Sequence, residues 1–330
     1  MLRMKRSKYL FFSSLCLIGS LVSCDFGQVS TENKDVLIVE RYQKLDNFAS
    51  GSGMVFYEGS FYMVGDDDPY LVEVNFNGAI TDTWLVWDTV DVVDGRIQKA
   101  MKHDFEAMSL FPFQHDTTFL IFGSGSVTPN RDLVYTFNPN KEEFDELNGE
   151  AFFTWLKQQA DLTDEEINLE GACFTNETLF LFNRHNNDIY TISASDVLHF
   201  IENGETNDLT LNKQHFELPT FNGDTARFSG ASTINGKNKL LFSASIETTD
   251  NWEADGEILG SFIGVIHLDE FETKTPYFCR LVYQNDSTRF EGKIEALHGI
   301  LDQENNLTIY FITDDDDGST GWGRITSFGL

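Results

Sequence analysis

One short phrase recurs along the chain and constrains the fold more than any other feature. Each copy starts with a Ser or Glu next to small residues and continues as an apolar stretch, a turn and a second apolar stretch. The copies start at Ser52, Glu106, Glu170, Ser229 and Glu295. These positions lie 54, 64, 59 and 66 residues apart, and such a period is typical of radially repeated β-sheets.

The segments between the copies supply the remaining strands that such an architecture needs. Runs such as YLVEVNF, LVYTFN, DIYTIS, FIGVIHL and YFCRLVY are strand-like, and turn signals such as Glu58-Gly59 separate them. We therefore predict an all-β fold over residues 35–330, a five-bladed β-propeller closed by pairing of residues 35–45 into the last blade. Two helical insertions on the rim are expected at 150–167 and 193–204. A doubly wound α/β fold would need a helix between most strands, which is not seen.

In a propeller, the first strand of each blade lines the central channel. The five starting residues therefore face one another in this prediction, as three carboxylates and two hydroxyls with no cationic repeat position to pair them. Such a cluster either raises its pKa values or holds a cation. An all-oxygen ring suits Ca²⁺ better than zinc, so the predicted calcium ligands are Ser52, Glu106, Glu170, Ser229 and Glu295. In the alternative, each glutamate caps backbone N–H groups of the neighbouring blade.

The turns that follow the second strand of each repeat are predicted to crowd the same rim, because antiparallel pairing returns the chain to that end. These tips are residues 65–68, 123–126, 183–186, 245–247 and 313–317. Two of them are nearly pure Asp, which favours a cation or substrate site over ordinary solvated turns. Arg131 and Arg184 are the evident cations nearby, so an anionic ligand needs them or the metal.

The N-terminal residues have the pattern of a targeting signal. Arg3, Lys5, Arg6 and Lys8 precede a short apolar stretch at 9–22, and Leu-Val-Ser-Cys ends at Cys24. This resembles the lipobox of bacterial lipoproteins, in which the cysteine is acylated. We predict a signal peptide at 1–23, lipidation of Cys24, a tether at 24–34 and a location in the bacterial cell envelope. An ordinary secretory signal or a short anchor helix is the alternative.

The charge of the chain excludes one class of partner. The formal net charge is −30, and loss of the four basic residues of the signal brings the mature form to about −34. So acidic a surface argues against nucleic acid and attracts divalent cations. Two cysteines, Cys173 and Cys279, remain after the signal and the lipidation site, too few for a disulfide framework. We expect two buried thiols, with one bridge possible.

The repeated phrases resemble those of the calcium-activated nucleotidases, or secreted apyrases. That family has five-bladed propellers with Ca²⁺ held at blade-start Ser and Glu positions, and the order Ser52, Glu106, Glu170, Ser229, Glu295 is similar. GMVFYEGSFYMVGDDD and EGACF…LFNRH are similar to the family's first-blade and third-blade stretches. Other extracytoplasmic propellers with inward glutamates, such as the phytase-like group, resemble it about equally. The likeness covers the inner strands and not the outer strands or helices.

The family's phosphate-contacting charges are only partly matched. Its Asp-Asp-Arg-Thr-Gly corresponds to residues 65–69, Gly-Asp-Asp-Asp-Pro, without the arginine. One arginine is replaced by His185, which leaves Arg184, and its Lys-Glu is replaced by Ser126-Val127. The resemblance therefore implies the scaffold and the metal more strongly than the nucleotidase activity.

Two functions remain open from the sequence. The first is a binding propeller with structural calcium, whose mouth holds a small molecule or a protein. The second is a Ca²⁺-dependent phosphoric-ester hydrolase in which the metal polarises a phosphoryl oxygen and an Asp activates water. The candidate catalytic residues are Asp66, Asp67, Asp68, Arg184, Asp314 and Asp315. The missing arginines favour binding, and no nucleophile elbow, Walker A motif or zinc motif is present.

Overall fold

A computed structural model describes residues 37–86, 92–93, 95–221, 223–234, 236–248, 257–285, 287–314 and 318–327. One compact unit extends from Asp35 to Leu330. The predicted signal peptide, the tether and Cys24 lie outside the described residues. Within the described part, no helix is long and apolar enough to span a membrane.

The described residues fold mainly as antiparallel sheets of four strands. The first sheet consists of β2 (Gly51–Tyr57), β3 (Ser60–Gly65), β4 (Tyr70–Val74) and β5 (Ile80–Leu85). The second consists of β8 (Phe105–Phe113), β9 (Asp116–Gly123), β10 (Val134–Asn138) and β11 (Glu143–Glu146). The third consists of β12 (Leu169–Thr175), β13 (Thr178–Asn183), β14 (Asp188–Ser193) and β15 (Asn212–His215).

The remaining long strands form one eight-stranded sheet. Its order is β18 (Arg227–Thr233), β19 (Lys239–Thr248), β20 (Glu257–His267), β21 (Phe278–Tyr283), β1 (Leu37–Leu45), β24 (Thr320–Ser327), β23 (Leu307–Asp314) and β22 (Lys293–Leu301). The N-terminal strand β1 pairs antiparallel with β24, which confirms that the early strand joins the last repeat. Strand β1 also pairs in parallel with β21, and the sequence did not predict this link.

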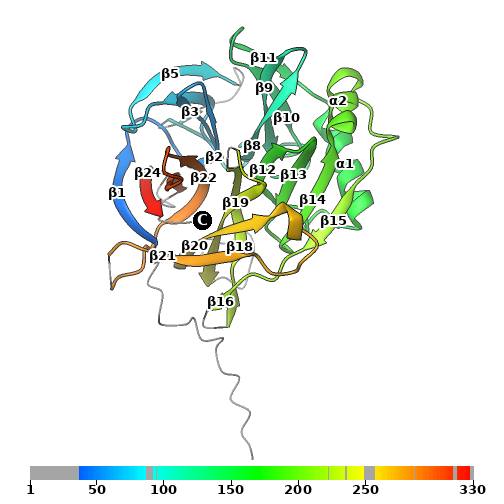
Figure 1. Ribbon diagram of the computed structural model, residues 1–330. Helices are drawn as coiled ribbons and strands as arrows, with labels where there is room; N and C mark the ends of the chain where they lie inside the picture. The colour runs from blue at the N-terminus through cyan, green and yellow to red at the C-terminus, as the bar shows by residue number, and fades with distance from the viewer. Residues whose placement is uncertain are drawn as a thin grey trace, which may run out of the picture. The chain divides into compact units, whose positions relative to one another are not determined.

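The innermost strands β2, β8, β12, β18 and β22 pack side by side in this order, and β22 returns to contact β2. Outer strands such as β5, β11, β15 and β1 lie at the periphery in Figure 1, so the sheets radiate from the inner strands. This closed, radial arrangement is that of a β-propeller. The apolar core lies between neighbouring sheets: for example, Phe61 of β3 stacks edge-on against Trp322 of β24 with ring centroids 4.9 Å apart.

The two predicted helices are present beside the third sheet, and one is shorter than predicted. Helix α1 (Gly149–Ala160) starts at Asn148, whose side chain accepts a hydrogen bond from the Ala151 N–H. It ends because Asp161 adopts a left-handed conformation, so the prediction of helix up to residue 167 was wrong. Helix α2 (Ala194–Asn203) agrees with the prediction, with Ser193 as N-cap and a left-handed Gly204 at its end.

Short elements complete the described chain. Two small hairpins are formed by β6 (Val92–Val93) with β7 (Arg96–Ile97), and by β16 (Thr220–Phe221) with β17 (Asp224–Thr225). A 3₁₀ turn spans Leu268–Glu270. The predicted turn at Glu58-Gly59 connects β2 to β3, with φ angles of 47° and 93° as a tight hairpin turn requires.

Candidate functional site

The five repeat positions share a structural feature that the sequence did not reveal. In every inner strand, the pairing register with the following strand shifts at the Ser or Glu that starts the repeat. The shifts fall between Gly51 and Gly53, Phe105 and Ala107, Leu169 and Gly171, Phe228 and Gly230, and Ile294 and Ala296. A β-bulge leaves its extra residue outside the ladder and re-aims the side chain. Ser52, Glu106, Glu170, Ser229 and Glu295 are therefore equivalent in structure.

Four of these residues line one cavity of about 350 Å³ at the ends of the inner strands. The full lining is Ser52, Asp66, Lys99, Lys102, Asp104, Glu106, Ser126, Val127, Arg131, Asn168, Glu170, Lys293, Glu295 and Asp314. Ser229 does not belong to this lining. Asp66, Ser126 and Asp314 come from the predicted tips, so the expectation that the tips crowd the repeat positions is confirmed for the described residues.

The two serines are bonded to the main chain of the next inner strand. The Ser52 hydroxyl donates to the Phe105 carbonyl, and the Ser229 hydroxyl donates to the Ile294 carbonyl at 2.6 Å. They connect β2 to β8 and β18 to β22. The serines thus connect neighbouring inner strands by donating to backbone carbonyls, whereas the capping alternative had the glutamates accept from backbone N–H groups.

No repeat position is cationic, but two of the glutamates have cationic partners from other positions, which the sequence did not predict. Lys293 Nζ lies 2.6 Å from Glu295 Oε1, and Arg184 Nε lies 3.8 Å from Glu170 Oε1. Glu247 joins these pairs, because its Oε1 is 2.7 Å from Arg184 Nη2 and 3.4 Å from Lys293 Nζ. The sequence could have indicated Lys293 as a partner, because it precedes Glu295 by two residues and alternate residues of a strand share a face.

A second charged group surrounds Asp104 at the start of β8. Lys102 Nζ lies 2.7 Å from Asp104 Oδ1 and 2.6 Å from Asp66 Oδ2, and Arg131 Nη1 lies 3.0 Å from Asp104 Oδ2. Ser124 also donates its hydroxyl to Asp104. Sequence analysis missed Asp104 and Lys102. Asp104 precedes Glu106 by two residues, and Lys293 precedes Glu295 by two residues, so the two side chains occupy equivalent places in their repeats.

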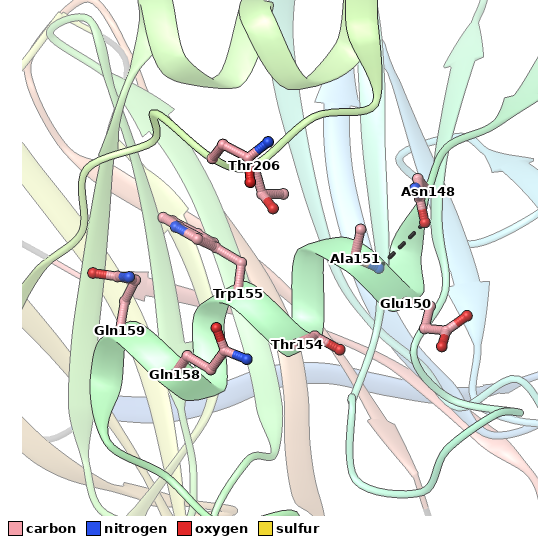
Figure 2. Close-up of a pocket in the computed structure, with 9 residues that line it drawn as sticks. Asn148, Glu150, Ala151, Thr154, Trp155, Gln158, Gln159 and Thr206 are labelled. Carbon is pink, nitrogen blue, oxygen red and sulfur yellow. Dashed lines mark hydrogen bonds between the residues drawn. The ribbon is translucent and has the colours of Figure 1, made fainter.

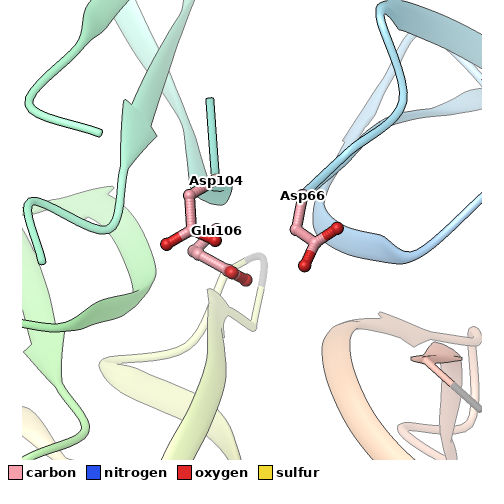
Figure 3. A group of neighbouring side chains, drawn as sticks. All are labelled: Asp66, Asp104 and Glu106. Atoms are coloured by element: carbon pink, nitrogen blue, oxygen red, sulfur yellow. The ribbon is translucent and has the colours of Figure 1, made fainter. Parts of the chain in front are cut away.

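Three carboxylates from two segments converge in this cavity. Asp66 follows β3, whereas Asp104 and Glu106 lie at the start of β8, and Figure 3 shows their side chains turned toward one another. One carboxylate oxygen from each lies within 4.8 Å of the others. Glu106 forms no hydrogen bond or ion pair with any other described residue. Among the described residues, this trio is the group of side chains whose potential metal ligands lie close enough together to hold one cation.

The pKa values of four cavity carboxylates, Asp66, Glu106, Glu170 and Glu295, are raised from their ordinary range. The pKa of Asp104 is lowered instead, because Lys102 and Arg131 outweigh the effect of burial. Burial raises the pKa of Asp66 to about 6, despite the nearby Lys102, and that of Glu295 to about 8, despite Lys293. Burial and the charges of Glu170 and Asp104 raise the pKa of Glu106 well above its ordinary value. Glu247 differs: burial opposes its ionisation, but Lys293 and Arg184 hold its pKa at about 2. Burial therefore favours the protonated forms of Glu106, Asp66 and Glu295, and a further positive charge in the cavity would offset this effect.

The candidate catalytic residues occupy different environments. Asp67 binds Arg96, with the Arg96 Nε 2.7 Å from Asp67 Oδ2, and lies away from the cavity lining. Asp68 accepts the backbone N–H groups of Ala49 and Tyr70 at 3.0 and 2.9 Å. Asp66 and Asp314 line the cavity, whereas Asp315 lies outside the described residues. Asp67 and Asp68 therefore have evident structural roles.

The two thiols show no disulfide. Cys173 and Cys279 are both free, with Cys173 buried and Cys279 partly exposed. Burial raises the pKa of both thiols, so they stay protonated at neutral pH. The expectation of two thiols is confirmed, the possible bridge is not formed, and neither thiol is activated.

A second hollow, of about 460 Å³, lies on the exposed side of α1 (Figure 2). It is lined by α1 residues such as Thr154, Trp155 and Gln158 together with Thr206 from the segment after α2. Glu150 is the single ionisable residue in its lining. It lacks the converging charged groups that distinguish the central cavity, so the central cavity is the candidate site.

Comparison with known families places the chain in one of them. The model of a family described as "Family of unknown function (DUF6929)" matches residues 47–324. The chain belongs to this family. The matched region contains all of the inner strands and the whole cavity lining. Among curated proteins, no relative matches the sequence.

Solved structures similar to this chain share little sequence with it. Glutaminyl cyclase from Myxococcus xanthus has a TM-score of 0.47 at 10% identity, covering 89% of this chain and 98% of that chain. An endo-arabinase from Bacteroides thetaiotaomicron has a TM-score of 0.48 at 11% identity, covering 89% and 97%. Streptogramin B lyase has a TM-score of 0.38 at 13% identity, covering 86% and 97%. TM-scores below 0.5 at such identities say nothing of a shared activity.

Proposed function

We propose that this protein is a calcium-binding, five-bladed β-propeller, anchored by lipid in the bacterial cell envelope, that binds a small molecule or a protein at its mouth. The observation that carries the proposal is the charge of the central cavity. Six carboxylates and four cationic side chains line it, which leaves an excess of two negative charges. Burying unpaired charge is costly, and one divalent cation neutralises this excess.

The donor chemistry of the cavity fits calcium. The unpaired donors are carboxylate oxygens, and Ca²⁺ takes six to eight oxygen ligands without a strict geometry. Buried cysteine and histidine, which zinc prefers, are absent from the lining. Ser52, Glu106, Glu170 and Glu295 are the repeat residues that line this cavity, in which we place the ion. Ser229 supports the adjacent strand through its bond to Ile294.

A count of five blades is consistent with the strand pairing. The eight-stranded sheet is joined at its middle by β1 and β21, which pair through Leu37 with Val282 and Ile38 with Tyr283. Separation at this short parallel link leaves two four-stranded groups, β18 to β21 and β22, β23, β24 with β1. Together with the first three sheets, these groups support a count of five blades.

The envelope location and the lipid anchor rest on the sequence of the first residues. The basic residues, the apolar stretch and the Leu-Val-Ser-Cys pattern ending at Cys24 support a lipidated N-terminus. The acidic composition supports a cation-binding role over contact with nucleic acid or anionic headgroups. A cavity that opens at the tips then provides the mouth for a ligand.

A Ca²⁺-dependent phosphoric-ester hydrolase is the second candidate. It is favoured by Asp66, a carboxylate with a pKa of about 6 in the cavity, which suits a general base. The pairing of the cavity cations speaks against it: Lys102, Arg131 and Lys293 all contact carboxylates, so an anionic phosphate meets little free positive charge.

A panel of phosphoesters and nucleotides, assayed with Ca²⁺ and with chelator, separates the two candidates. We expect no calcium-dependent release of phosphate by the wild type, because the cations are neutralised. Turnover that requires Ca²⁺ and is lost in Asp66→Asn, with Asp67→Asn as the matched control, would establish the hydrolase instead.

A further inference from the structure

We propose that the cation is seated off the channel axis, on Asp66, Asp104 and Glu106, and that Lys102 is a resident counter-ion which the cation displaces. This inference rests on the proposed function, because it assumes that the cavity binds a divalent cation. It differs from the ring of five repeat residues, since it uses only Glu106 of that ring. The proposed site also includes Asp66 and Asp104, which are not repeat positions.

The spacing of the three carboxylates matches the coordination distances of calcium. Calcium–oxygen distances are about 2.3–2.6 Å, so two oxygens on one ion are at most about 5 Å apart. One carboxylate oxygen each of Asp66, Asp104 and Glu106 lies within 4.8 Å of the others. The trio therefore reaches a single ion without movement of the backbone.

Oxygens without partners give a second, independent indication of a cation site. Glu295 lines the same cavity with only 4% of its surface exposed, and its Oε2 is buried with no hydrogen-bond partner. Asp66 Oδ1 is likewise buried without a partner. Buried carboxylate oxygens normally have a hydrogen-bond or cationic partner. A cation bound in the cavity would give both oxygens such a partner.

Lys102 already occupies the position of a cation in this group. Its Nζ lies between Asp66 and Asp104, 2.6 and 2.7 Å from their oxygens. When all three carboxyl groups are ionised, as calcium ligands are, the trio carries three negative charges, and Lys102 and Arg131 together supply two positive ones. If Ca²⁺ enters and Lys102 leaves, Arg131 and the ion together supply three positive charges. These balance the three carboxylates of the trio. The long, flexible lysine stem permits this withdrawal.

The repeat ring is less suited to hold the ion alone. Glu170 and Glu295 already contact Arg184 and Lys293, and the Ser52 hydroxyl hydrogen bonds to Phe105. Glu106 is the ring carboxylate without such a contact among the described residues. An ion bound near Glu106 therefore gains most by turning toward Asp66 and Asp104.

The first test measures calcium affinity by titration calorimetry in three proteins. Asp66→Asn and Glu170→Gln both remove one negative charge from the cavity, so they share the long-range electrostatic effect. We expect Asp66→Asn to weaken binding at least about tenfold more than Glu170→Gln, because it also removes a direct ligand. If Glu170→Gln weakens binding as much or more, the ring holds the ion and the inference is overturned, although the proposed function stands. If the wild type binds no Ca²⁺, the proposed function itself fails.

The second test uses the wild type and so does not depend on the folding of a variant. Acetylation of lysines is measured by mass spectrometry with chelator and with saturating Ca²⁺. We expect Ca²⁺ to increase the labelling of Lys102, while Lys99, which lines the cavity without a carboxylate partner, keeps its labelling. Unchanged or reduced labelling of Lys102 in the Ca²⁺-bound protein would show that it is not displaced, which overturns the exchange.

Discussion

Stability of the calcium-free protein is expected to fall as the pH rises from 6.5 to 8. Burial raises the pKa of Glu295 to about 8, while the ordinary value is 4.5. Between these values the folded state holds a proton that the unfolded state has lost, so raising the pH favours unfolding. Glu106, whose pKa is also well above its ordinary value, acts in the same direction.

Starting at pH 6.5 reduces the opposite contribution of the histidines. Burial lowers the pKa of His103 and of His298 from 6.5 to about 4. Below pH 6.5 the unfolded state therefore binds more protons at these residues, and stability rises with pH there. Above pH 6.5 their contribution levels off, and the carboxylates dominate.

The size of the effect follows from the proton balance. One proton held only by the folded state changes stability by about 1.4 kcal/mol per pH unit. Because the pKa of Glu295 is about 8, the slope weakens near that pH, and Glu295 alone accounts for about 1–2 kcal/mol between pH 6.5 and 8. Saturating Ca²⁺ replaces the protons and should flatten the profile.

The assay is urea unfolding at pH 6.5 and at pH 8, with chelator and with Ca²⁺. The control is Glu295→Gln, which keeps the shape of the side chain and cannot ionise, so its calcium-free stability should depend less on pH. A calcium-free wild type that is equally stable or more stable at pH 8 would refute the argument that the cavity carries uncompensated carboxylates.

Three further changes test the fold, the ion pairs and the anchor. Gly171→Ala should cost about 1–3 kcal/mol in urea unfolding, since its Cβ would lie 2.8 Å from the Ala231 nitrogen; unchanged stability contradicts this packing. Arg184→Met should cost about 3–5 kcal/mol, because Glu247 loses a buried partner at 2.7 Å; a loss below 1 kcal/mol, about that of a surface pair, counts against it. Cys24→Ser should move the protein from the membrane fraction to the soluble fraction or block cleavage, and unchanged fractionation and mass exclude lipidation.

The inner strands of the fold could be predicted from the sequence because each repeat carries the same local pattern. Apolar runs and turns such as Glu58-Gly59 fix strands and hairpins within a few residues. The parallel pairing of β1 with β21 could not be predicted, since it joins residues that are distant in the chain through only two registered pairs. Helix α1 was predicted too long because its end depends on the left-handed conformation of Asp161.

The candidate site could be predicted only in part. The repeat phrase located Glu106, Glu170 and Glu295, and strand pairing placed Asp66 beside them. Arg131 and Arg184 were recognised near the tips, but Lys102 and Lys293 were missed because both precede the residue that starts the repeat phrase. The bulges could not be predicted either, because a register shift depends on the partner strand and not on the local sequence.

The central claim is that the cavity binds calcium in the folded state. Thermal unfolding of the wild type with chelator and with added Ca²⁺ tests it most directly. A ligand that binds only the folded state at a hundredfold excess over Kd adds about 2.7 kcal/mol of stability, so Ca²⁺ should raise the melting temperature. Two superimposed melting curves would mean that calcium does not bind and that the cavity carboxylates are balanced by protons and by their lysine and arginine partners.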